Sequence, residues 1–115
     1  NYTSYQGDII MAVTWSILQL ERQVTTGGVF MAHWLVEDHE VVDEVIHVGR
    51  VADMESLLFD ATSDTFTPYT DVTEEQVVEW VKESLGSDEL ARILNSVATE
   101  ISESKTPTTA KGTPW

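Results

Sequence analysis

The chain has no cysteine, no long hydrophobic run and few basic residues. Without cysteine there is no disulfide, and no thiolate acts as a nucleophile or metal ligand. No apolar stretch approaches the ~20 residues that a membrane-spanning helix needs. The N-terminus also lacks the basic start and apolar segment of a secretory signal. We therefore expect no membrane partner.

The charge of the chain is strongly acidic. Lysine and arginine total 6 against 20 aspartates and glutamates, which gives a formal net charge of −14. Nucleic acids and anionic membrane surfaces attract basic proteins, so this balance predicts no nucleic-acid partner. Two interpretations remain. The charge keeps the protein in solution, or it imitates DNA and occupies a nucleic-acid-binding protein.

The length of 115 residues is that of one domain. Residues 1–10 precede the first methionine, Met11, and we expect them to be a tag or a translated upstream segment. Residues 11–105 carry the periodic patterns of a single α+β domain. Residues 106–115 form a polar C-terminal tail that ends in Trp115.

Three segments alternate as β-strands do. The first covers residues 12–23, where a change of phase predicts a bulge near Ile17. Two adjacent glycines at 27 and 28 predict a turn before a second strand over residues 29–36. The acidic stretch at residues 37–40 predicts the next turn, followed by a third strand over residues 41–51. The stretch from 52 to 69 predicts either a short strand or a helical turn, followed by a loop.

The segment from Thr73 to Ile101 has helical periodicity. Thr73 and Gln76 have the spacing of a capping box, in which each side chain bonds the other residue's backbone N–H. Gly86 predicts the end of one helix, and Ser87 the start of another. The predicted fold is therefore α+β: an antiparallel three- to four-stranded meander followed by two C-terminal helices packed on one face.

Both faces of the second predicted strand are apolar, so one face is left uncovered if the helices pack on the other. We expect the uncovered face to be an interface between copies of the chain, because large exposed apolar patches usually mark contact surfaces. Trp115 either folds back on its own domain or anchors on another chain. The predicted interface residues are Val29, Met31, His33, Leu35 and Trp115.

No constellation predicts catalysis. His33, His39 and His47 are the only histidines, and their spacing with nearby carboxylates matches neither the zinc patterns nor the calcium loop. There is no G-x-S-x-G motif and no phosphate-binding loop. We therefore expect no enzyme, no catalytic residue, no cofactor and no bound metal.

Several motifs resemble a family of small uncharacterised proteins of tailed marine phages, especially short-tailed cyanophages. These motifs are MAVTW-x-I-x-Q-L-E-R at 11–22, AHW at 32–34, P-Y-x-D-V-T-E-E-Q-V-V-x-W-V at 68–81, and the KGTPW end at 111–115. The middle of the chain, at about 37–67, matches least. The family has no established activity, so the resemblance implies a viral setting and no catalytic residue.

The expected function is that of a non-enzymatic phage protein, a minor virion or assembly component. It would act through self-association and binding of another phage or host protein, in the host cytoplasm or the virion. The alternative is an acidic, host-directed inhibitor that mimics DNA.

Overall fold

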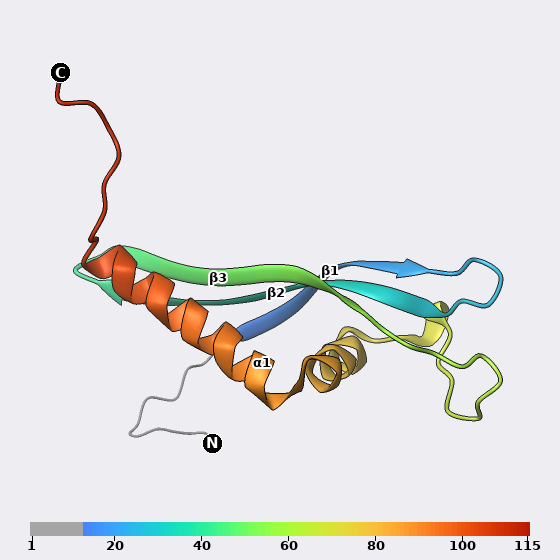
Figure 1. Cartoon of the computed structure of the whole chain (residues 1–115). Coiled ribbons are helices and arrows are strands. Elements are labelled where there is room, and N and C mark those ends of the chain that lie inside the picture. The colour runs from blue at the N-terminus through green and yellow to red at the C-terminus, as the bar shows by residue number, and fades with distance from the viewer. Residues whose placement is uncertain (1–12) are drawn as a thin grey trace.

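The computed structural model describes residues 13–115, so the predicted tag or upstream segment at 1–10 lies outside the described residues. Three strands, β1 (Thr14–Arg22), β2 (Val29–Val42) and β3 (Val45–Ser56), form an antiparallel sheet in the order β1-β2-β3. A short 3-10 helix, η1 (Tyr69–Asp71), and the helix α1 (Glu74–Lys105) follow. The predicted α+β class and antiparallel meander are confirmed, with three strands (Figure 1).

The first hairpin has a bulge on each strand. The pairing of β1 with β2 shifts between Ile17 and Gln19, so Leu18 is the extra residue and the bulge predicted near Ile17 is confirmed. A second shift lies near Arg22, which pairs with Val29, while Glu21 pairs with Met31. An extra residue on β2 therefore changes which face its first residue occupies.

The second turn lies later in the chain than predicted. Residues 37–40 are part of β2, and the turn is formed by Asp43 and Glu44 between the paired residues Val42 and Val45. Both turn residues have positive φ angles, 52° and 67°, as a two-residue type I′ hairpin turn requires. The turn predicted at 37–40 is wrong, because strands tolerate charged side chains wherever these point to solvent.

The structure shows one helix, α1, where the sequence predicted two. Its backbone at Gly86 is not helical, with φ 84° and ψ 165°. Only glycine adopts such dihedrals readily, so this residue bends the helix, and the axis changes direction there in Figure 1. The prediction is corrected because the chain resumes helical geometry without an intervening loop.

Of the two hydrogen bonds in the predicted capping box, only one is formed at the start of α1. The Thr73 hydroxyl accepts a hydrogen bond from the Gln76 backbone N–H at 3.2 Å. The Gln76 side chain does not return to Thr73. It donates to the Thr67 hydroxyl at 3.1 Å and so ties the preceding loop to the helix.

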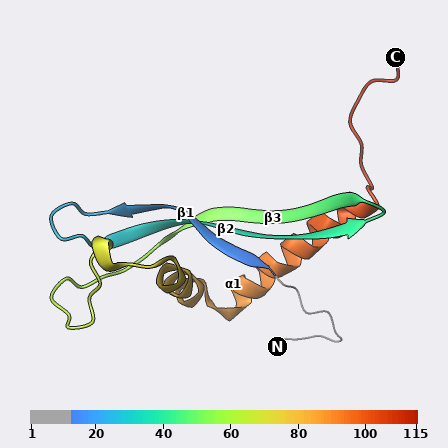
Figure 2. The same cartoon turned by 180° about the vertical axis from the view of Figure 1, so that it is seen from behind.

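The core lies between α1 and one face of the sheet. The helix contributes the apolar stripe that its periodicity predicted, and β2 contributes its inward side chains. These core residues are Val29, Ala32, Trp34 and Val36 from β2, Leu57, and Val77, Val81, Ile93, Val97 and Ile101 from α1. In Figures 1 and 2, α1 follows one side of the sheet, and no element within residues 13–115 covers the opposite side.

Candidate functional site

The uncovered side of the sheet, which we call the open face, is the first candidate site. It contains Met31, His33 and Leu35 of β2, which pair with Ser56, Met54 and Ala52 of β3. Met31 and Leu35 are partly exposed, and Met54 is 54% exposed. Farther along the face, Val41 pairs with Ile46, and Ile46 is 63% exposed. Apolar side chains thus extend along the sheet from its middle to the β2–β3 turn.

Val29 does not belong to this face. It is 4% exposed and lies in the core, because the extra residue near Phe30 shifts the phase of β2. Strict alternation along the strand predicts Val29 on the same face as Met31. This prediction is wrong, because Val29 lies in the core. Leu18, the bulged residue of β1, is 62% exposed and was not predicted as a site residue.

A histidine–carboxylate hydrogen bond and an ion pair lie among these apolar side chains. His33 Nε2 is 2.6 Å from Glu21 Oε2, and Arg50 Nη2 is 3.7 Å from Glu37 Oε1. Each pair joins neighbouring strands on the same face, because His33 lies opposite Gln19 and Glu37 lies opposite Arg50. The open face therefore combines apolar area with charges that already have partners, and such charges cost less to bury than isolated ones.

The edges of the sheet are partly occupied by carboxylates of α1. Glu74 accepts the backbone N–H of Ile17 on β1 at 2.9 Å, and Glu100 accepts that of Arg50 on β3 at 3.1 Å. Free N–H groups on an edge strand invite pairing with another chain. Bonding them to the helix reduces that tendency at one position on each edge.

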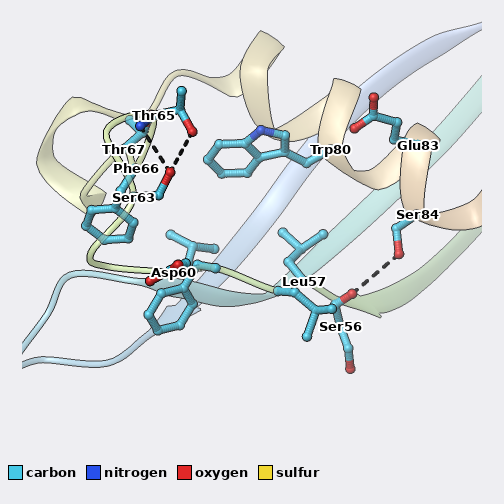
Figure 3. A pocket seen from close by; sticks show the side chains of 13 residues that line it. Ser56, Leu57, Asp60, Ser63, Thr65, Phe66, Thr67, Trp80, Glu83 and Ser84 are labelled. Carbon is cyan, nitrogen blue, oxygen red and sulfur yellow. Dashed lines mark hydrogen bonds between the residues drawn. The ribbon is translucent and has the colours of Figure 1, made fainter.

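The second candidate site is a pocket of about 560 Å3 between the first half of α1 and the loop that follows β3 (Figure 3). Leu57, Phe59, Phe66 and Trp80 supply apolar and aromatic walls, and the Phe59 and Phe66 rings are 5.8 Å apart. Asp60 and Glu83 also line the pocket. No sequence pattern predicts this pocket, because contacts between residues distant in the chain build it.

Asp60 stabilises the loop that closes this pocket. Its carboxylate accepts the Thr62 hydroxyl at 2.6 Å and the Thr62 backbone N–H at 3.0 Å. These hydrogen bonds lower the pKa of Asp60, with the hydroxyl bond the larger cause. The carboxylate therefore stays ionised, and together with Glu83 it makes the pocket acidic.

The remaining predicted residue, Trp115, lies in the tail and is 94% exposed. The tail, residues 106–115, is exposed throughout, so Trp115 does not fold back on its own domain in this structure. No interface is described at this residue.

The three histidines are not brought together as a metal site. The His47 ring bonds Ser104 of α1 at 2.8 Å, the His33 ring bonds Glu21, and His39 lies in the β2–β3 ladder. Within residues 13–115, no group of three or more histidines, aspartates and glutamates is placed to hold a metal ion. In the same part of the chain, no helix has both the length and the apolarity needed to cross a bilayer.

Comparison with known families gives one match. Residues 11–115 match the model of a family described as a domain of unknown function (DUF7936). The chain belongs to this family. The match includes all the strands, α1 and the exposed tail. Neither curated proteins nor solved structures gave a match.

Proposed function

We propose that this chain is a non-enzymatic protein that acts by self-association and by binding another protein, through the open face of its sheet. The supporting observation is the unequal covering of the sheet: α1 packs on one side, and exposed apolar side chains occupy the other. Exposed apolar patches of this kind usually mark contact surfaces. A two-fold dimer is the commonest way for one face to meet itself.

The face is a better candidate than the edges for this contact. Edge pairing between copies needs free backbone N–H and C=O groups, and α1 already occupies the N–H groups of Ile17 and Arg50. Within residues 13–115 the open face has no such covering, and the polar side chains of His33, Glu37 and Arg50 on it already have partners. We therefore place Met31, His33 and Leu35 in the interface.

The resemblance to proteins of tailed marine phages supplies the setting of the proposal. In that setting the second partner is a phage or host protein, and the protein works in the host cytoplasm or the virion as a minor or assembly component. The alternative, an acidic inhibitor that mimics DNA, draws on the net charge of −14. Acidic residues lie on all three strands, in the loops and along α1, and no observation favours the alternative over self-association.

The test replaces Met31 and Leu35 together with glutamate. Removing a central contact costs about 2 kcal/mol or more, which raises Kd about 30-fold. We expect light scattering to show a folded monomer of 12.9 kDa for this double variant. The control, Ser87→Glu with Asn95→Glu, adds the same charge at exposed positions of α1 and should keep the native mass.

Circular dichroism checks that each variant is folded. If Met31→Glu with Leu35→Glu unfolds the chain, Ile46→Glu with Met54→Glu repeats the test at more exposed positions of the same face. A folded variant that keeps the oligomeric mass contradicts the assignment of the open face.

A further inference from the structure

The pocket beside Trp80 has the size and lining of a site for an aromatic side chain. Its volume of about 560 Å3 lies within the ~300–1,000 Å3 typical of ligand pockets. Phe59, Phe66 and Trp80 present aromatic surface, and Figure 3 shows the Trp80 ring facing the loop across the pocket. An aromatic ring placed there would meet other rings at their edges and faces, an arrangement that adds stability beyond the area buried.

The charge of the pocket favours a segment that carries a cation. The lining residues include Asp60 and Glu83 but no lysine or arginine. The occupant that this combination selects is a short segment with an aromatic side chain and a basic residue close to it in sequence.

The tail of the chain is such a segment. It ends in Lys111, Gly112, Thr113, Pro114 and Trp115, with the indole 94% exposed. Arg50, Arg92 and Lys105 have acidic partners, Lys82 has Glu79, and Arg22 lies over the Tyr69 ring. Within residues 13–115, Lys111 has neither an acidic partner nor an aromatic one. Its positive charge is therefore available to an acidic pocket.

The tail is also biased towards an extended shape. Thr106 and Thr113 each precede a proline, and this position disfavours helical backbone. An extended segment loses little conformational freedom when it binds along a groove.

The tail of the same molecule leaves α1 at the end opposite to the residues that line the pocket, and in Figures 1 and 2 it points away from the helix. Glu103 accepts the backbone N–H of Thr108 at 2.7 Å and its hydroxyl at 2.6 Å, which fixes the start of the tail at the end of α1. The residues beyond Thr108 span at most ~25 Å when fully extended. The part of α1 that follows the bend at Gly86, up to Glu103, is itself ~26 Å long. A second molecule has no such restriction.

We propose that Trp115 of a second copy inserts into this pocket, with Lys111 of that copy close to Asp60 and Glu83. The contact deepens the self-association proposed above but uses a different surface. Each copy has one tail and one pocket, so the exchange is reciprocal in a closed dimer and sequential in a chain of copies.

The test uses the absence of cysteine, which allows a spin label to be attached at one chosen position. The label is placed on Thr113→Cys in unlabelled protein, and this protein is mixed with full-length ¹⁵N-labelled chain. Only contact between molecules then broadens the observed signals. We expect loss of signal at the amides of Ser63, Thr65 and Phe66 and at the Trp80 indole. Asp43, at the opposite end of β3, should be unaffected.

Two tail substitutions in the spin-labelled chain make the test specific. Trp115→Ala should abolish the broadening, and Thr109→Ala, an exposed tail position, should preserve it. The proposal is overturned if the pocket signals keep their intensity, if Trp115→Ala leaves the broadening unchanged, or if broadening appears only when label and isotope are in one chain. If the pocket signals are unaffected while Met31→Glu with Leu35→Glu still lowers the mass, the tail contact fails and the open-face interface stands.

Discussion

Glu103 connects the last turn of α1 to the tail. Its carboxylate accepts two hydrogen bonds from Thr108, and these bonds lower the pKa of Glu103, with the hydroxyl bond the larger cause. The contact is present at neutral pH. It is lost as the pH falls through this lowered pKa, because the protonated carboxyl is a weaker acceptor. Acid therefore releases the tail from the helix end.

Substitution of Thr108 tests this connection at the level of one residue. Thr108→Ala removes the hydroxyl donor, so the pKa of Glu103 should rise towards its ordinary value. A pH titration of the Glu103 side-chain carboxyl by ¹³C NMR measures the change. Thr109→Ala, with no such hydrogen bond, serves as the control. An unchanged Glu103 pKa in Thr108→Ala would show that the hydroxyl does not bond the carboxylate in solution.

Among the elements, the contact of α1 with β3 depends on a close approach at one glycine. Gly49 is buried, and a methyl group added there would overlap the Val97 carbonyl oxygen. The obstacle is helix backbone. Any larger residue at this position must push α1 away from the sheet.

Gly49→Ala should therefore destabilise the domain by about 1–3 kcal/mol, the usual cost of overpacking a core. Urea unfolding followed by circular dichroism measures the change in the free energy of unfolding. Val48→Ala, at the neighbouring position on the open face, should cost less than about 1 kcal/mol. Equal losses for the two variants would mean that α1 does not lie against β3 at Gly49.

The sequence predicted these elements where local chemistry decides them. The helical stripe, the Thr73 cap, the bulge near Ile17 and the turn at Gly27 and Gly28 all follow from neighbouring residues. The second turn was misplaced because acidic residues occur both in loops and at solvent-exposed positions of a long strand, and the sequence does not distinguish the two. Val29 was assigned to the wrong face because the signal for the bulge near Phe30 lies in the pairing with β1. The pocket was missed because Phe59, Phe66 and Trp80 meet only in three dimensions.

For the whole molecule, self-association depends on the balance between apolar attraction and charge repulsion. Two copies with a net charge of −14 each repel one another, and salt screens that repulsion over ~8 Å at physiological ionic strength. The free energy gained by burying the open face must exceed the repulsion that remains after screening. Self-association should therefore strengthen as the salt concentration rises, as expected for contact between acidic copies through an apolar surface.

The mass of the unsubstituted protein in solution tests the central claim most directly. Sedimentation equilibrium over a range of concentrations, at physiological ionic strength, gives this mass without any change to the chain. We expect a mass of at least twice 12.9 kDa at tens of micromolar, falling towards 12.9 kDa on dilution. A mass of 12.9 kDa at every concentration would contradict self-association and with it the proposed function.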